Sequence, residues 1–324
     1  MDRRNFGKWV ACAGFFAAAP LVLAQPVRFP SRPIRFIVPF AAGGGGDTVA
    51  RLLALRLGER INTPVLVENR VGAGGNIGAD HVLKSPPDGY TLLNMSSTYP
   101  IQAAVSPLPF DPLADMQPII MISRDPVVLV VNPASPLRDA RDLAEAARRT
   151  PDKLTHGSAG VGSIAHLGME ELAFVMGVKL VHVPYKGSAQ AFNDVLSGNV
   201  DMMLTSVTFA APFVRSGRVR ALGIAGTSRL PSFSDVPTFE EQGFAGYNVV
   251  DWKAIAGPKG MPAAVVAYLN TELNAVLAHR AVAEKFRAEG TTAVGGSPEQ
   301  MLQIVRADIL RWKKVVDKAN IKIQ

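Results

Sequence analysis

The sequence predicts an α/β fold in two lobes that enclose a cleft. Apolar runs of strand length alternate with segments in which apolar residues recur every three or four positions, a pattern typical of a mostly parallel sheet with helices on both faces. Glycine-rich loops stand where predicted strands end and predicted helices begin. The strand–helix pattern restarts after Val127 and returns to a strand near Trp252, so the second lobe is expected to be inserted within the first.

The composition is that of a folded protein. Of the 324 residues, 48% are hydrophobic and 19% are charged, which excludes a disordered or collagen-like chain. The single cysteine, Cys12, excludes a disulfide framework and a cysteine-based zinc site. The formal net charge is +7 at pH 7, but no basic run is interleaved with aromatic residues, so we expect no nucleic-acid partner.

Residues 1–24 are predicted to be a signal peptide. A positive segment that ends at Lys8 precedes an apolar stretch from Trp9 to Leu23, and small residues up to Ala24 fit a signal-peptidase site. The apolar stretch is shorter than the ~20 residues that a spanning helix needs. The paired arginines near the start fit the twin-arginine export route, and a plain Sec signal is the alternative.

The expected elements follow from periodicity and turn residues. Strands are apolar runs, and helices repeat apolar residues at helical spacing, as at Val49, Leu53 and Leu57. Residues 86–89 mark a turn before the third strand. The expected strands span residues 34–40, 65–68, 90–95, 127–131, 154–158, 179–183, 200–204, 219–224 and 249–256. The expected helices span residues 49–57, 77–83, 137–149, 164–176, 262–279 and 298–319, with a short helix within 235–243.

These elements divide between two lobes. The first lobe is expected to comprise residues 25–127 and 251–324, and the second residues 128–250. The chain would cross between the lobes twice, which makes a natural hinge. A ligand would bind in the cleft between the lobes.

The first glycine loop, residues 40–48, joins a strand end to a helix start. Four consecutive glycines allow a ligand to approach the backbone, and the N–H groups of a helix start favour anions. Asp47 is a plausible N-cap. A tight connection without a ligand is the alternative. A nucleotide P-loop is excluded because no Gly-Lys-Ser/Thr follows.

Two further loops resemble nucleotide or catalytic motifs only superficially. Residues 70–78 lack the third glycine of a dinucleotide fingerprint, because Ile77 occupies that position. Residues 156–163 lack a nucleophile elbow, because His156 stands where Gly would be needed before Ser158. The five histidines show no metal-ligand spacing, and no carboxylate pair suits acid–base work. We therefore expect no catalytic residue, no metal and no cofactor.

Three other residues each allow two interpretations of their role. Lys186 could contact an anion or be solvated, and Trp252 could close the cleft or pack in the core. His166 lies early in a helix with an apolar face and is more often a structural histidine than a ligand in such a setting.

Several motifs, in order, resemble one family. They are Pro33–Phe40 with its glycine run, Val67–Arg70 with residues 72–75, Pro87–Leu93, residues 157–163 and His182–Gly187, continued by residues 220–222 and 235–238. They look like the Bug family of extracytoplasmic solute receptors, the substrate-binding component of tripartite tricarboxylate transporters. The resemblance runs from about Pro30 to the C-terminus. It implies a two-lobed type II periplasmic-binding-protein fold with a hinge and an interdomain cleft.

The resemblance implies a carboxylate held by loop amides, hydroxyls and water. Together with Gly44 of the glycine run, the candidate ligand-binding residues are Phe40, Ala42, Gly43, Asn76, Ser158, Gly160, Ser163, His166, Tyr185, Thr205 and Ser206. The chain departs from the family pattern at two places. The family often has Trp-Tyr-Gly where this chain has Trp252-Lys253-Ala254, and the glycine run is looser than the usual Pro-Gly-Gly. Lys253 could add a cation near the cleft mouth or point to solvent.

The expected function is capture of a small organic acid in the periplasm for the membrane permease subunits of a tripartite transporter, by a monomer that closes on its ligand. The alternatives are a ligand-sensing adaptor for a membrane sensor and an exported hydrolase. Normal growth of a deletion strain on the ligand would favour the adaptor. Turnover that Ser158→Ala or Ser163→Ala abolishes would favour the hydrolase. The identity of the ligand stays open, because backbone N–H groups are the same in every residue and do not indicate which acid they bind.

We expect Gly44→Val to weaken binding of an organic acid and to leave the fold intact, because the valine side chain would occupy space that the ligand needs. Titration calorimetry measures the affinity, and circular dichroism checks the fold. An unchanged affinity would remove the first glycine loop from the site.

Overall fold

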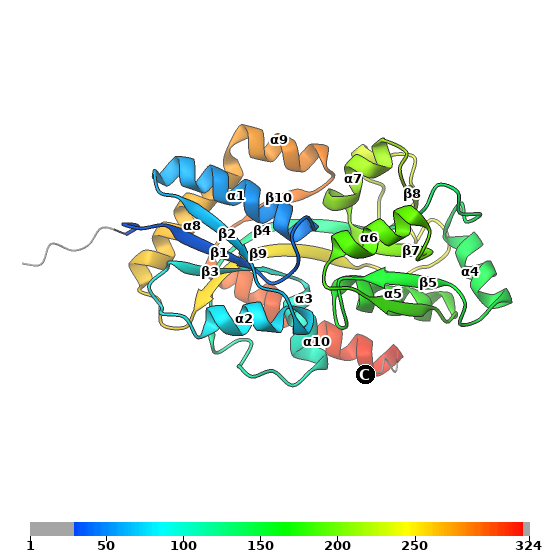
Figure 1. Ribbon diagram of the computed structural model, residues 1–324, viewed down its shortest axis with the longest axis horizontal. Coiled ribbons are helices and arrows are strands. Elements are labelled where there is room, and N and C mark those ends of the chain that lie inside the picture. The colour runs from blue at the N-terminus through cyan, green and yellow to red at the C-terminus, as the bar shows by residue number, and fades with distance from the viewer. Residues whose placement is uncertain (1–28, 320–324) are drawn as a thin grey trace, which may run out of the picture.

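The computed structural model describes residues 29–319 and shows a mixed α/β protein whose two lobes lie side by side along one curved sheet (Figure 1). The predicted signal peptide, residues 1–24, lies outside the described residues. The strand order is β2-β1-β3-β9-β4-β7-β5-β6, and β8 and β10 pair with β4. Two long strands in the middle of this order therefore connect the lobes.

The first lobe is built from strand–loop–helix units. Their elements are β1 (Ile34–Val38), α1 (Gly45–Ile61), β2 (Val65–Asn69), a 3-10 turn (Ala73–Gly75), α2 (Asn76–Leu83), β3 (Thr91–Ser96) and α3 (Thr98–Val105). Strand β1 lies between β2 and β3 and is parallel to both. The loops after β1, β2 and β3 therefore leave the same edge of the sheet, and this edge faces the second lobe (Figure 1).

The second lobe repeats this arrangement. Its elements are α4 (Ala140–Arg149), β5 (Thr155–Ser158), α5 (Ile164–Met176), β6 (Val181–Pro184), α6 (Ser188–Ser197), β7 (Met202–Ser206), α7 (Val207–Arg215), β8 (Arg220–Ile224) and a 3-10 turn (Pro231–Phe233). Strand β5 is parallel to β6 and β7. Helices α5, α6 and α7 thus start at one edge of the sheet.

The connection between the lobes is β4 (Met116–Val131) together with β9 (Val250–Pro258). Residues 116–126 of β4 pair antiparallel with β9, and residues 127–131 pair with β7 and β8. The chain then ends with α8 (Ala263–Ala278), α9 (Arg280–Ala288), β10 (Thr292–Gly295) and α10 (Pro298–Ala319). We propose that the lobe boundaries lie where the pairing of β4 changes, close to the predicted boundaries at 127–128 and 250–251.

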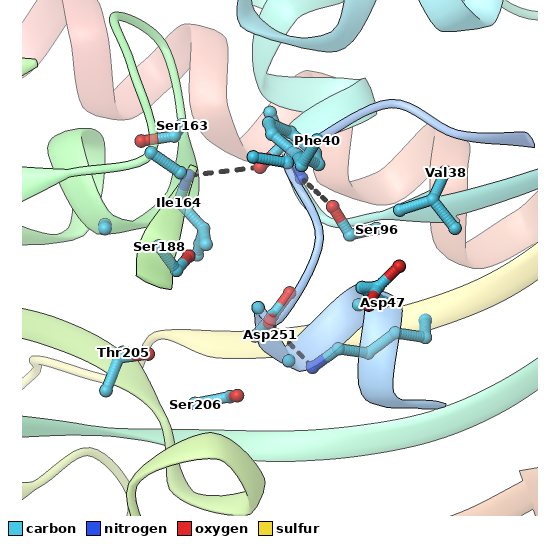
Figure 2. A pocket seen from close by; sticks show the side chains of 18 of the residues that line it. Val38, Phe40, Asp47, Ser96, Ser163, Ile164, Ser188, Thr205, Ser206 and Asp251 are labelled. Carbon is cyan, nitrogen blue, oxygen red and sulfur yellow. Dashed lines mark hydrogen bonds and ion pairs between the residues drawn. The ribbon is translucent and has the colours of Figure 1, made fainter. Parts of the chain in front are cut away.

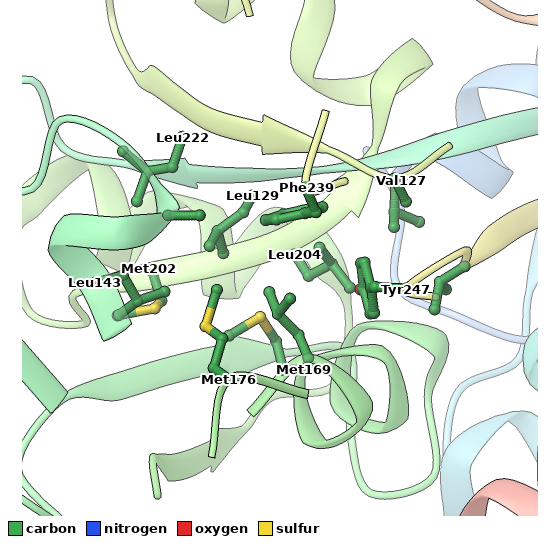
Figure 3. Packing of buried hydrophobic residues seen from close by; sticks show 14 of the residues in the cluster. Val127, Leu129, Leu143, Met169, Met176, Met202, Leu204, Leu222, Phe239 and Tyr247 are labelled. Atoms are coloured by element: carbon green, nitrogen blue, oxygen red, sulfur yellow. The ribbon is translucent and has the colours of Figure 1, made fainter. Parts of the chain in front are cut away.

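Helix α10 packs against both lobes. Trp312 in its last third is buried in a second-lobe core cluster that also takes Ile101 from α3 of the first lobe. Figure 3 shows the centre of this cluster, where methionines of α5 meet Leu129 and Leu204 of the sheet. Because protein cores are close-packed, α3 and α10 couple the second lobe to the first beyond the two strands.

The structure corrects several sequence predictions. The sheet is mixed, because β9 and β4 run antiparallel to their neighbours. Strand β4 starts at Met116 rather than Val127, since Arg124, Asp125 and Pro126 continue the strand despite interrupting its apolar run. The expected helix within residues 235–243 is a series of turns. Elements α3, α6, α7, α9 and β10 were not predicted. Among residues 29–319, no helix has the length and apolarity to cross a membrane.

Candidate ligand-binding site

A small chamber lies between the lobes, where the edges of the two half-sheets face each other. Its volume is about 60 Å³, and both lobes line it. The first lobe contributes Phe40, the glycine run and the end of β3, and the second contributes Ala159, Ser188 and the end of β7. Figure 2 shows Ser163 and Ser188 on one side and Thr205 and Ser206 below. We call this space the inner chamber.

Four helices begin at the wall of the inner chamber. The first residues of α1, α5 and α6 line it, and so does Ser206, the N-cap of α7. No side-chain cap occupies the starts of α1, α6 or α7. The N–H groups of a helix's first turn lack partners within the helix and carry partial positive charge. The inner chamber is therefore suited to an anion.

The lobes touch each other around the inner chamber. Gln102 Nε2 of α3 donates to the Val161 carbonyl of the second lobe at 2.8 Å, and the Ile164 N–H donates to Thr98 Oγ1 at 3.3 Å. Close approaches occur at two glycines. A Cβ on Gly187 would meet the Ala41 Cβ at 2.8 Å, and a Cβ on Gly45 would meet Ser206 Oγ at 2.9 Å. Gly187 therefore needs to be glycine when the lobes are together, whereas a side chain at Gly45 would require Ser206 to move.

A buried ion cluster forms the floor of the inner chamber. Lys253 Nζ lies 2.6 Å from Asp125 Oδ2 and 2.8 Å from Asp251 Oδ2, and the Lys253 side chain is 1% exposed. Burial acts to lower the pKa of Lys253, but the two carboxylates outweigh it and raise that pKa above its usual value. Because strands β4 and β9 carry all three residues, the cluster sits at the connection between the lobes.

Hydroxyl groups from both lobes complete this cluster. Ser97 Oγ donates to Asp251 Oδ1 at 2.5 Å, and Thr208 Oγ1 donates to Asp125 Oδ1 at 2.6 Å. Ser97 precedes α3 in the first lobe, whereas Thr208 lies in α7 of the second lobe. Buried charges require such partners. The cluster therefore links the first-lobe α3 and the second-lobe α7 through the two connecting strands.

Asp47 holds the glycine run in place. Its Oδ2 accepts the Gly43 N–H at 2.9 Å, and its carboxylate pairs with Arg51 and accepts from Asn69. Burial acts to raise the pKa of Asp47, but the bonds from Arg51, Gly43 and Asn69 together lower it. The carboxylate is thus neutralised by Arg51 and shapes the loop, rather than acting as the N-cap that the sequence suggested, since the N-cap is Gly44.

A second, larger chamber of about 600 Å³ lies beyond Phe40 and Ala159, which line both spaces. Residues 72–76 and Gln102 of the first lobe line this chamber, opposite Gly160, Tyr185 and Lys186 of the second. We call it the outer chamber. Among residues 29–319, Lys186 is the one charged side chain that lines it.

The predicted site residues fall into three groups. Phe40, Gly44, Ser163, Thr205 and Ser206 line the inner chamber. Phe40 also lines the outer chamber, together with Asn76, Gly160 and Tyr185. The Tyr185 hydroxyl is turned to Asp194 at 2.5 Å. Ala42, Gly43, Ser158 and His166 line neither chamber.

Sequence reasoning missed other lining residues, among them Asn94, Ser96, Thr98, Ser188 and Asp251, and it left the place of Lys253 open. Position was a usable signal for three of them, because Ser96 ends β3 and Thr98 and Ser188 begin α3 and α6 at the edge where the lobes meet. Lys253 lies neither at the cleft mouth nor in solvent. Trp252 packs in the first-lobe core, where its Nε1 donates to Asp308 at 2.6 Å.

Three stacked histidines support the loop between β5 and α5. The ring centroids of His166 and His182 are 3.8 Å apart, and His156 lies 5.1 Å from His182. The Gly162 N–H donates to His166 Nδ1 at 3.1 Å, and His182 Nε2 lies 2.6 Å from Ser158 Oγ. Burial lowers the pKa of His166 to about 4 and that of His182 to about 3. The loop is thus built on neutral imidazoles.

The Ser158–His182 contact does not form an accessible nucleophile. Ser158 is fully buried, and its Oγ also accepts the Gly160 N–H at 3.0 Å. The Ser158 hydroxyl therefore stabilises the loop that contains it. Within residues 29–319, no three His, Cys, Asp or Glu side chains are grouped so that they could hold a metal ion.

We expect the free energy of unfolding to fall as the pH drops from about 6.5 towards 4. The unfolded chain binds protons on its histidines in this window, whereas buried His166 stays neutral. For His166 alone the loss is on the order of 3 kcal/mol. Urea titrations at several pH values measure it. His166→Asn should flatten the dependence, and an equally steep loss in that variant would contradict the assignment.

The sequence pattern of the tripartite tricarboxylate transporter family receptor, TctC, matches residues 49–321. A UPF0065 protein encoded in the tcbD-tcbE intergenic region of Pseudomonas sp. (strain P51) is 38% identical over 97% of this chain and 95% of its own length. Protein BugT of Bordetella pertussis is 36% identical over 99% of this chain and all of its own.

Solved structures of similar proteins share the whole fold. Periplasmic binding protein BugD superimposes with a TM-score of 0.88 at 33% identity, over 91% of this chain and 100% of that chain. Rpa4515 of R. palustris with adipate gives a TM-score of 0.87 at 35% identity, over 90% and 99%. MatC of Rhodopseudomonas palustris with bound malate gives 0.86 at 32% identity, over 89% and 100%. With these matches along nearly its full length, the chain belongs to the TctC family of tripartite tricarboxylate transporter receptors, which includes the Bug proteins.

Proposed function

We propose that this chain is a periplasmic receptor that captures a small organic acid between its lobes and delivers it to a tripartite tricarboxylate transporter. The observation that carries the proposal is the convergence of four helix starts from two lobes on one enclosed chamber. Each lobe supplies part of the anion site, so a carboxylate is fully surrounded only when the lobes meet.

The binding cycle follows from this division. With the lobes apart, a carboxylate would contact the helix starts of one lobe only. Closure adds the helix starts of the other lobe, so the ligand binds the closed form more tightly and shifts the population towards it. The membrane partner would then recognise the closed form. No bond in the ligand is broken in this cycle.

Two solved relatives support an acid as the ligand. Rpa4515 was solved with adipate and MatC with malate, and both compounds are dicarboxylates. In this chain, the groups suited to a carboxylate are the N–H groups of residues 44–46 and 165 and the hydroxyls of Ser188, Thr205 and Ser206, which line the inner chamber. Arg51, the nearest arginine to the glycine run, is engaged by Asp47.

Further parts of the proposal concern catalysis, export and oligomeric state. The family consists of solute receptors rather than enzymes, and we propose that this chain also acts without catalysis. We propose export through the signal peptide of residues 1–24, by the Sec or the twin-arginine route. We also propose that the receptor is a monomer that docks on permease subunits in the membrane.

A thermal-shift screen of the mature protein against mono-, di- and tricarboxylates tests the function. A ligand present at 100 times its Kd should stabilise the protein by about 2.7 kcal/mol and raise Tm accordingly. The methyl ester of each active acid is the matched control and should give no shift, because it lacks the charge. A panel in which no acid raises Tm would reject the proposal.

Closure itself is tested by Gly187→Ala. Gly187 has an extended backbone that alanine also adopts, so the folded lobes should be unaffected, but the added Cβ would meet Ala41 across the cleft. We expect at least a tenfold weaker affinity. Small-angle scattering should show a smaller ligand-induced compaction than in the wild type. Wild-type affinity and compaction together would show that this contact is not needed.

A further inference from the structure

We propose that the exposed face of α10 docks on the surface of an anionic lipid bilayer, through basic side chains that surround two exposed apolar side chains. The inference goes beyond capture of the ligand and does not depend on which acid is captured. It assigns a membrane-facing surface to a receptor that would pass its ligand to permease subunits in the membrane.

Helix α10 presents one continuous face to solvent. From residue 303 onward its exposed side chains repeat every three or four positions, so they lie on one side of the helix. The opposite side carries Val305, Ile309 and Trp312, which are buried in the cores of the two lobes. We call the exposed side the α10 face. Its residues are Gln303, Arg306, Ala307, Leu310, Lys313, Lys314, Asp317 and Lys318.

The charge of the α10 face is predominantly positive. The face carries four basic side chains and one acid, Asp317. Within residues 29–319, none of these four basic side chains makes an ion pair, whereas the adjacent Arg311 is paired with Glu171 at 2.8 Å. Four cationic groups on one helix face are therefore left to meet an external anion.

The acids of the neighbouring helix α5 do not occupy these cations. Glu171 is 14% exposed and is held by Arg311. Glu170 is 30% exposed, and its Oε1 lies 3.5 Å from His156 Nε2, on the side of the histidine stack. Neither carboxylate forms an ion pair with the α10 face, so the face keeps its positive charge beside α5.

Two large apolar side chains are exposed among the cations. Leu310 is 61% exposed in the middle of the α10 face, and Phe174 of α5 is 46% exposed. Lys318 Nζ lies 5.8 Å from the centroid of the Phe174 ring, so this ring borders the face. Lysines around exposed apolar side chains are typical of surfaces that lie in a bilayer interface, where apolar groups enter the headgroup region and cations meet phosphates.

The spacing and type of the cations favour a bilayer over a protein partner. Arg306 and Lys318 are separated by about 18 Å along the helix axis, so the cations form a row rather than a pocket for one anion. Three of the four are lysines, whose flexible point charges lack the bidentate geometry with which arginine recognises a single carboxylate. A row of flexible cations suits a fluid surface that presents many phosphate groups.

The position of the α10 face leaves the cleft free. Helix α10 runs along the outer border of the molecule past both lobes (Figure 1), and none of its residues lines either chamber. A receptor docked through this face could therefore still bind and release its ligand. Docking would confine its search for the permease to the plane of the membrane.

The test is co-sedimentation of the mature protein with vesicles of phosphatidylcholine and phosphatidylglycerol, and with vesicles of phosphatidylcholine alone. We expect binding to the anionic vesicles only, and weaker binding as the salt concentration rises from about 0.05 to 0.5 M. The double substitution Lys313→Gln with Lys314→Gln should weaken binding about 10- to 30-fold, from about fivefold for each basic residue near an anionic surface.

The matched control is Arg218→Gln with Arg287→Gln. Both arginines are exposed, and they lie after α7 and within α9, at the opposite border of the molecule from α10 (Figure 1). The control removes the same charge and should bind like wild type. Leu310→Ala tests the apolar contact and should reduce the binding that persists at high salt, where the charges are screened.

Three results would overturn the inference. Equal losses in the lysine variant and in its control would reduce the effect to net charge. A wild type that does not bind anionic vesicles would reject the bilayer and leave the α10 face to an acidic protein. Unchanged binding of Leu310→Ala at high salt would remove the apolar contact. The thermal shift with organic acids should be the same in every variant, so a failure here is distinct from a failure of the proposed function.

Discussion

The ion cluster of Lys253 with Asp125 and Asp251 is the constraint on which the arrangement of the lobes depends. Taking a lysine out of water is costly, and removing one partner of such a buried group is expected to cost several kcal/mol. The cluster is satisfied only if β4 and β9 lie in register and if Ser97 and Thr208 approach from opposite lobes. With the lobes together, their position relative to the chamber floor is therefore set by one network of hydrogen bonds.

This network also shapes the electrostatics of the site. Two carboxylates and one ammonium leave a net negative charge in the floor, while helix starts line the walls with partial positive charge. A ligand carboxylate is favoured at the walls and disfavoured at the floor, so its orientation is determined without an arginine. Under the proposed function, helix starts from both lobes are needed for the ligand, so binding and closure would be coupled.

The strand–loop–helix units were predictable from sequence because each is a local pattern. Helix α5, residues 164–176, and helix α10, residues 298–319, have the predicted bounds because clear turn residues and periodic apolar faces define them. Helix α7 was missed because Pro212 lies within it. The course of β4 and the burial of Lys253 were also unpredictable. Asp125 and Lys253 look like solvent-facing residues until their pairing across 128 positions of sequence is known.

Under the proposed function, the acids that this fold accepts depend on the volume of the inner chamber when the lobes are together, rather than on particular side chains that recognise the ligand. Gly187 and Gly45 allow the lobes to approach closely, since a Cβ at either position would meet Ala41 or Ser206 across the cleft, and the inner chamber is correspondingly small. A bulkier group in the inner chamber would hold the lobes apart and lose the second set of helix starts.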